Sequence, residues 1–382
     1  MSAVRSLFAA PRARGALLLV AALGVSVSAG AAFHAMRVPE PIVAGPGVTH
    51  ATMLSAFVPE LADTPGDTPV FVLEGEEPGG TFLLIGGCHP QEISGMIAAV
   101  LTVENVRVRR GRVVVVPEAN RSGFSHTEPL EAFPHRFDID TPNGPRTFRN
   151  GMRLTSPAHQ WPDPDLYVHH PSGEPMIGLE ARNLNRNFPG RPGGRLTERV
   201  GHGLVTLAEA TEIDLVLDMH EAYPEYPIIN MMVAHERAFG LATMARLMMQ
   251  MRGISMDLMA SPPQLRGLSH REFGDRTDAY AVLSETANPL MGRFRGRTDE
   301  RLLLEGRDPN YVRAAELGLL FVPFTDEGHP LVRRVARQLA TIEELLAAYN
   351  EAHPDRVVEL EGLPTYEEVR ERGIGAFLQA TD

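Results

Sequence analysis

The chain has 382 residues, of which 43% are hydrophobic, and this is enough to bury a large core in one or two domains. Its formal net charge is −12, and no basic run follows the N-terminal arginines, which argues against a nucleic-acid-binding surface. A single cysteine, Cys88, excludes an internal disulfide framework, so stability must come from the core.

The first residues predict an export segment. Arg5, Arg12 and Arg14 precede an apolar stretch over residues 15–33 that is rich in alanine near its end. This pattern is typical of a signal peptide, and the same 19 residues are long enough to anchor the chain in a membrane. Both alternatives place the remaining chain in the periplasm or another extracytoplasmic compartment. We assign residues 1–33 to this segment and residues 34–69 to a linker.

Residues 70–350 are predicted to form the main domain. Apolar runs alternate with helical patterns there, which indicates a three-layer α/β/α fold with a mainly parallel mixed sheet. We expect strands at residues 81–85, 113–116, 214–219, 228–233 and 281–285. We expect helices at residues 94–103, 198–210, 236–252 and 331–349. Residues 351–382 are left as a C-terminal extension.

A proline-rich segment interrupts this domain over residues 124–181. It holds 9 of the 31 prolines and the only tryptophan, Trp161, and it shows no periodic element. A long insertion of this kind in a compact domain is usually a lid or a wall of a pocket.

Two histidine motifs predict a metal site. In "GGCHPQEISG", His89 follows an apolar run and Glu92 lies three residues later; in "LDMHEA", His220 ends another apolar run. Ligands in open α/β sheets gather where the strands end, and a catalytic zinc ion takes three protein ligands plus water. His89, Glu92 and His220 would complete such a set. The alternatives are a chance HxxE spacing and a His220 that only forms a hydrogen bond within a turn.

Two further motifs carry residues suited to hydrolysis. Glu285 closes the apolar run in "AVLSETANP", where a carboxylate near a metal could accept a proton from water. Asn185 and Arg186 in "NLNRNFPG" can donate several hydrogen bonds to one carboxylate. The alternatives are a capping or surface carboxylate for Glu285 and a solvated loop for the Asn-Arg pair.

Together and in this order, the four motifs resemble the succinylglutamate desuccinylase/aspartoacylase branch of the zinc carboxypeptidase superfamily, over about residues 80–300. The resemblance implies Zn²⁺ as the cofactor and Glu285 as the general base. It also implies that Arg153, in "RNGMRL", stabilises the oxyanion, with Arg149 as the second choice. An arginine that recognises the acyl carboxylate would lie before Glu285; Arg276 is nearest in position, although Arg271 is equally available.

The predicted function is therefore the hydrolysis of an amide bond in a small molecule or short peptide that bears a carboxylate. The branch resemblance favours an N-acyl amino acid deacylase. An exported location also suits a metallocarboxypeptidase that trims cell-wall or other short peptides. A non-catalytic protein that binds zinc or a ligand is the alternative of a different class.

Overall fold

The structure is a computed structural model that describes residues 11–127 and 133–381. The chain divides into two compact units, Met1–Pro39 and Glu40–Asp382, each described here by itself. Residues 1–10 of the predicted export segment and residues 128–132 of the proline-rich segment lie outside the described residues.

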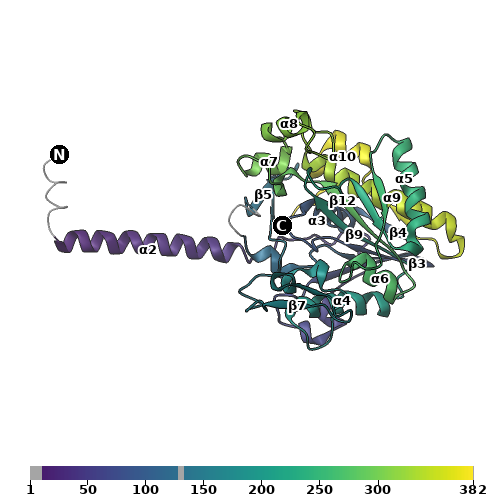
Figure 1. The fold of residues 1–382 in the computed structure, drawn as a ribbon, viewed down its shortest axis with the longest axis horizontal. Coiled ribbons are helices and arrows are strands. Elements are labelled where there is room, and N and C mark those ends of the chain that lie inside the picture. Colours follow the sequence, from purple (N-terminus) through teal and green to yellow (C-terminus); the bar gives the residue numbers. More distant parts are fainter. Residues whose placement is uncertain (1–10, 128–132, 382) are drawn as a thin grey trace. The chain divides into compact units, whose positions relative to one another are not determined.

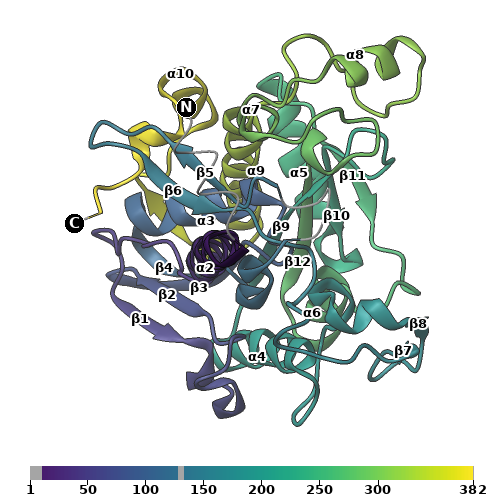
Figure 2. The same ribbon diagram turned by 90° about the vertical axis from the view of Figure 1, so that its left-hand side faces the viewer.

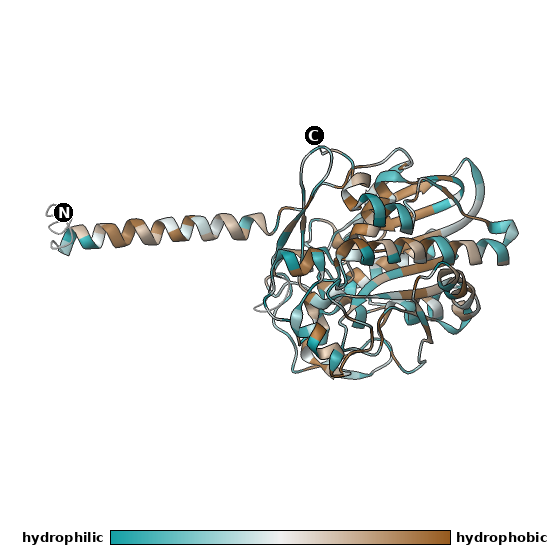
Figure 3. Cartoon of the chain, turned by 90° about the horizontal axis from the view of Figure 1, so that it is seen from above, coloured by the Kyte–Doolittle hydropathy of each residue, from teal (hydrophilic) through white to brown (hydrophobic). Residues whose placement is uncertain are grey.

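In its described residues, the first unit forms the apolar helix α2 (Pro11–Ala35), which contains the whole predicted apolar stretch. None of its residues is buried, and its mean hydropathy is 2.2 over the most apolar window (Figure 3). The helix has 25 residues, each of which adds about 1.5 Å. Its length therefore exceeds the roughly 30 Å thickness of a bilayer core. Within the described ranges, it is the one helix that is long and apolar enough to cross a membrane.

The second unit is built on a mixed sheet, which comprises nine strands in the described part of the chain. Its centre is parallel and runs in the order β4 (Arg107–Val116), β3 (Glu77–Ile85), β9 (Leu215–Ala222) and β12 (Tyr280–Ala287). Beyond β12 lie β10 (Met231–Ala234), which is antiparallel to it, and β11 (Asp257–Ala260), which is parallel to β10. Beyond β4 lie the antiparallel strands β2 (Pro69–Glu74) and β1 (His50–Met53).

Helices cover both faces of this sheet (Figures 1 and 2). One face packs against α3 (Ile93–Asn105), α5 (Phe239–Met251), α9 (Leu331–Ala352) and α10 (Tyr366–Arg372). The other face packs against α4 (Leu196–Ala210) and α6 (Ser269–Arg276). Between β12 and α9 the chain forms the short helices α7 (Glu300–Glu305) and α8 (Pro309–Glu316). The predicted α/β/α fold is confirmed.

The local sequence explains why the central strands form. Every residue of β9 is buried, because alternate side chains enter two separate cores. Leu217 packs in the core under α9, while its neighbour Val216 packs in the core under α4. A strand with two covered faces reads as a continuous apolar run, and this is why the sequence revealed β3, β4, β9 and β12.

Two segments differ from the sequence-based expectation. The predicted linker, residues 34–69, supplies β1 and the fully buried Leu54 and Leu61, which pack beside α4. The predicted C-terminal extension supplies β13 (Glu359–Glu361), which pairs with β4, and α10, whose Val369 is buried against α9. Neither segment has a clear hydrophobic periodicity in its sequence. Their structure depends instead on contacts with residues that are far away in the chain.

The proline-rich segment contains two hairpins that its composition concealed. They are β5 (Arg136–Ile139) with β6 (Arg146–Arg149), and β7 (Leu166–Val168) with β8 (Pro175–Ile177). Glu174 and Met176, from the second hairpin, line the main cleft of the unit. The segment therefore forms part of a pocket wall, one of the two roles expected of it.

Candidate metal centre

The carboxyl ends of three neighbouring parallel strands bring the predicted residues together. His89 lies four residues after the end of β3, while His220 of β9 and Glu285 of β12 are partners in the register of the parallel pair. Gly87 turns the chain after β3 at a φ of +64°, where a Cβ would lie 2.9 Å from the Phe124 ring. The turn leads directly to Glu92, the residue that precedes α3.

Three buried side chains form a compact donor set. Glu92 Oε1 lies 2.8 Å from His89 Nδ1, and Glu92 Oε2 lies 2.7 Å from His220 Nδ1. The Nδ1 atoms of the two histidines lie 3.2 Å apart. The ligand atoms of all three residues lie within 4.8 Å of one another, so they can converge on one ion.

The hydrogen bond made by Nε2 of each imidazole determines whether Nδ1, which faces the other two ligands, carries a proton. His89 Nε2 lies 2.9 Å from Asn183 Oδ1, and His220 Nε2 lies 2.8 Å from Asp218 Oδ2. Both oxygens accept hydrogen bonds, so in the neutral form of each imidazole Nε2 carries the proton and Nδ1 offers a lone pair to a cation. Two facing lone pairs beside a carboxylate repel one another unless a cation lies among them.

The pKa values of the two histidines move in opposite directions. Burial lowers the pKa of His89 to about 4, which keeps this imidazole neutral. Burial also acts against the charged form of His220, but the Asp218 and Glu92 carboxylates raise its pKa well above the usual value. The centre therefore favours a positive charge, and two nitrogens with one carboxylate oxygen match the ligands that zinc takes in proteins.

A second layer of contacts holds these ligands from behind. Ser269 Oγ donates to Asp218, and Gln338 Nε2 of α9 donates to the backbone oxygen of His220 at 2.8 Å. Arg334 of α9 is fully buried and donates to both oxygens of Glu221 at 2.8 and 3.0 Å. The strand end that bears His220 is thereby fixed by residues more than 100 positions later in the chain.

We expect Asp218→Asn to lower zinc affinity by about 10- to 100-fold, because outer-layer partners of ligating histidines typically contribute that much. Asparagine can still accept from His220 Nε2, so the change removes charge and not the hydrogen bond. Competition with a chromophoric chelator measures the affinity, and Asp165→Asn, at an exposed position, is the control. Equal affinities in the two variants would contradict the positioning role of Asp218.

Glu285 lies beside the donor set, and one of its carboxyl oxygens has no hydrogen-bond partner among the described residues. This oxygen, Oε2, is buried. Burial, followed by the charge of Glu92, raises the pKa of Glu285 well above its usual value. A raised pKa makes a carboxylate a stronger base, which suits it to accept a proton and return it later.

His89, Glu92 and Glu285 open onto a cleft of about 700 Å³ that several arginines also line. Arg153 and Arg186 both line it, and no carboxylate forms an ion pair with either in the described part of the chain. Burial and the charge of Arg153 lower the pKa of Arg186, a cost that a bound anion would relieve. Asn185 is held next to Arg186 by its Oδ1, which accepts from the backbone N–H of Ser269 at 2.8 Å.

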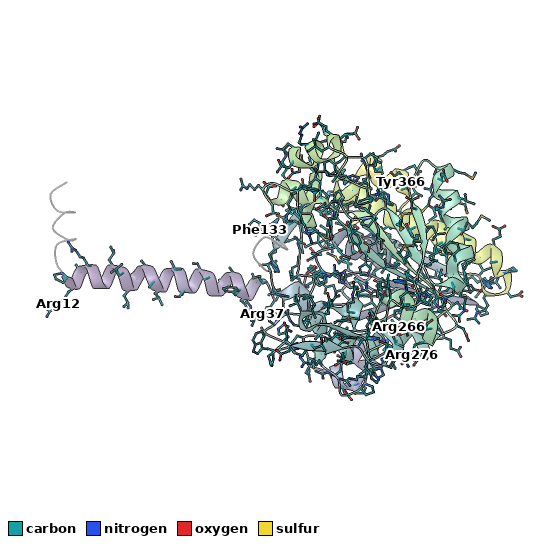
Figure 4. All side chains as sticks on the ribbon, in the orientation of Figure 1. Arg12, Arg37, Phe133, Arg266, Arg276 and Tyr366 are labelled. Carbon is teal, nitrogen blue, oxygen red and sulfur yellow. The ribbon has the colours of Figure 1, made fainter. Side chains whose placement is uncertain are left out.

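The structure leaves the two other arginines outside the cleft. Arg276 is exposed at the last position of α6 (Figure 4). The first residues of α6 face the site, and eight helical residues span about 10 Å, so Arg276 lies well outside the cleft. Its predicted contact with an acyl carboxylate is not supported by this position. Arg149, the second choice for the oxyanion role, is buried in ion pairs with Glu40 and Glu118.

Sequence reasoning missed four residues of the centre. Asn183 and Asp218 orient the histidines, Gln91 Oε1 accepts from the Arg153 backbone N–H at 3.0 Å, and His270 lines the cleft. Asp218 had a readable signal, because a residue two positions before His220 on a strand points to the same face. His270 had none, since its approach depends on the packing of α6.

No protein-family model and no curated protein matches the chain. Solved structures that resemble it include a succinylglutamatedesuccinylase/aspartoacylase from Rhodobacter sphaeroides, with 20% identity over 57% of this chain and 51% of that chain, at a TM-score of 0.37. The product-bound ectoine utilization protein EutE (DoeB) from Ruegeria pomeroyi has 18% identity over 59% and 55% of the two chains, at 0.37.

The tripeptide-bound cell shape determinant Csd4 from Helicobacter pylori also resembles the chain. It has 13% identity over 79% of this chain and 59% of that chain, at a TM-score of 0.46. The chain spans between 51% and 59% of the length of these three structures.

Proposed function

We propose that the protein is a zinc-dependent hydrolase that cleaves an amide bond in a carboxylate-bearing substrate, with N-acyl amino acids as the first candidates. The observation that carries the proposal is the shared location of three elements in one cleft. These are the donor set of His89, Glu92 and His220, the unpartnered oxygen of Glu285, and the pair Arg153 and Arg186, which form no ion pair with a carboxylate in the described part of the chain.

His89 Nδ1, Glu92 and His220 Nδ1 would hold the metal, with Asn183 and Asp218 fixing the two rings. Zinc, when bound, supplies a Lewis acid that polarises a carbonyl group and lowers the pKa of water toward about 7. The buried position of the three ligands keeps competing solvent away from them. A catalytic zinc site keeps an open position, and the cleft provides access to it.

Glu285 would move the proton during hydrolysis. Its carboxylate accepts a proton from the attacking water and later donates it to the nitrogen of the leaving amine. The unpartnered Oε2 is the atom available for this transfer. Arg153 would donate to the carbonyl oxygen as negative charge develops there, a contribution typically worth about 3 kcal/mol.

Asn185 and Arg186 would hold the carboxylate of the substrate. Arginine offers a planar fork that matches a carboxylate, and the asparagine amide can add a further donor. The lowered pKa of Arg186 gives the same indication, because an anion stabilises the charged guanidinium. This contact would align the scissile amide between the metal ligands and Glu285.

The first unit supports an exported location. Arg12 and Arg14 lie at the N-terminal end of α2, and positive charge usually stays on the cytoplasmic side of a membrane helix. The catalytic unit would then enter the periplasm or another extracytoplasmic compartment, either released after cleavage or anchored by α2. Fractionation of cells that express the full chain tests this location.

A metallocarboxypeptidase that acts on short peptides is the second candidate. The cleft of about 700 Å³ is in the range that holds a drug-sized ligand, and it therefore has room for several residues. A screen of N-acyl amino acids beside short peptides, with zinc-loaded protein, separates the two candidates. Tight zinc binding without any turnover would instead favour a non-catalytic binding protein.

We expect Arg186→Met to lower kcat/KM by about 10- to 100-fold, since hydrogen bonds to charged groups contribute about 1.5–3 kcal/mol. Amidation of the substrate carboxylate should cost the wild-type enzyme a similar factor and cost the variant little. Steady-state kinetics on both substrates complete this cycle, with the exposed Arg313→Met as the control. An amidated substrate that is equally good for the wild type would exclude the contact.

A further inference from the structure

The floor of the cleft beside Glu285 is a row of apolar side chains on three neighbouring strands. Val233 of β10 is the register partner of Leu283 on β12 and of Met259 on β11. Partners in register point to the same face of a sheet, and Leu283 shares that face with Glu285, two residues later. All four residues line the cleft, so the apolar row begins directly next to the proposed base.

Apolar residues from the surrounding loops extend this surface. Those that line the cleft are Ile228, Leu265, Leu268, Leu290 and Met291. Val233 and Leu283 are only 4% and 3% exposed, so the floor is deep and not a surface patch. A deep apolar surface gains binding free energy from each apolar group that a ligand buries on it.

The arginines of α6 and of the loop before it form ion pairs or lie outside the cleft, whereas Arg293 and Arg295 line the cleft on the side of Leu290 and Met291. Arg266 lines the cleft, but its guanidinium pairs with Glu272 at 2.8 Å and also with Asp275. Arg271 is 1% exposed and pairs with Asp275 and Glu236. Since Arg276 lies outside the cleft, none of Arg266, Arg271 and Arg276 offers an unpaired charge to an acidic group on the floor.

A buried histidine adds an independent sign of a ligand at this place. His270, in the first turn of α6, lines the cleft and is 2% exposed. Neither ring nitrogen has a hydrogen-bond partner among the described residues. Buried polar groups almost always have partners, so the ring marks a position where a polar atom of a ligand, such as an amide, would be bound.

We propose that the row Leu283–Val233–Met259 is a subsite for an apolar, uncharged group adjacent to the scissile amide, and we call it the apolar subsite. The inference rests on the proposed function, and it restricts the class of substrates that the proposed hydrolase would accept. They would carry a long alkyl or aromatic group in place of the second carboxylate of an N-acetylaspartate or N-succinyl compound. The group can belong to the acyl part or to the amino-acid part of the substrate.

Two matched substrate series distinguish these two sources. The full-length chain, zinc-loaded in detergent, is assayed with N-acetylleucine against N-acetylaspartate, and with N-hexanoylglycine against N-succinylglycine. We expect kcat/KM to favour the apolar member of at least one pair. Each buried methylene should contribute about fourfold, so the preference should reach about 10- to 200-fold.

A substitution on the edge strand tests the position of the subsite. Met259 is half-buried on β11, and Met259→Arg would place a guanidinium over the floor. We expect this variant to lose most of the preference for the apolar member and to gain activity on the acidic one. Met251→Arg makes the same chemical change at a position that is 87% exposed on α5, and it should keep the wild-type preference.

Binding to the Glu285→Gln chain separates failure of the subsite from failure of the reaction. A larger thermal stabilisation by apolar than by acidic ligands supports the subsite, even if the wild type hydrolyses none of the amides and the proposed function fails. Faster hydrolysis of the acidic members, by contrast, keeps the proposed function and overturns the subsite. Equal stabilisation by both ligand classes also overturns it.

Discussion

Replacement of Glu285 by glutamine is expected to lower kcat by about 10²- to 10⁴-fold on any accepted amide, the range that a general acid–base group contributes. Glutamine keeps the shape of the side chain, but its amide cannot accept and return a proton at neutral pH. The three proposed metal ligands are unchanged, so the variant should bind zinc with the stoichiometry of the wild type. Single-turnover kinetics on the best substrate, together with metal analysis, measure both quantities.

The matched control is Glu316→Gln, which makes the same change in a surface ion pair with Arg313. It should keep wild-type kcat. A Glu285→Gln enzyme with undiminished kcat would show that another group carries the proton. A loss of zinc in the same variant would mean that Glu285 supports the metal centre, and the role of the base would then have to be reassigned.

Removal of either imidazole should have the second large effect. We expect His89→Ala and His220→Ala to lose stoichiometric zinc after dialysis and to fall to background activity. Each substitution leaves two of the three donors, and a bound zinc ion needs a nearly complete tetrahedral shell. Elemental analysis of the dialysed protein gives the metal content, and an assay with excess zinc shows whether activity returns.

His170→Ala is the control, because His170 is exposed on the loop of the β7–β8 hairpin. Its zinc content should equal that of the wild type. Circular dichroism separates loss of the metal from loss of the fold. Stoichiometric zinc in a folded His220→Ala protein would exclude the ligand set and, with it, the proposed reaction.

The parts of the fold that could be predicted are those whose signal is local. The central strands are buried on both faces and appear in the sequence as continuous apolar runs. Helix α9 carries an apolar stripe over 22 residues and appears as a helical periodicity. The edge strands β1 and β13 have four and three residues and depend on partners far along the chain. Short strands of this kind are stabilised by pairing with a neighbouring strand. The local sequence pattern does not show which partner they will have.

The candidate site divides in the same way. His89, His220 and Glu285 could be placed because each lies in or just after the carboxyl end of a readable strand, and the carboxyl ends of parallel strands meet at one edge. Arg276 was misplaced because distance along the chain says nothing about which end of α6 faces the site. His270 was overlooked for the same reason. Its distance from Glu285 in sequence is ordinary, and only the packing of α6 brings it to the cleft.

The anchoring of His220 and Glu221 by Gln338 and Arg334 has a consequence for biogenesis. An unfinished polypeptide, even one that already contains every proposed catalytic side chain, lacks the α9 clamp that secures the histidine-bearing strand. The proposed metal centre would therefore form late, after the last quarter of the chain has been synthesised and α9 has packed against the sheet. If the chain is the exported hydrolase that we propose, this order of assembly would delay its activity until synthesis is nearly complete.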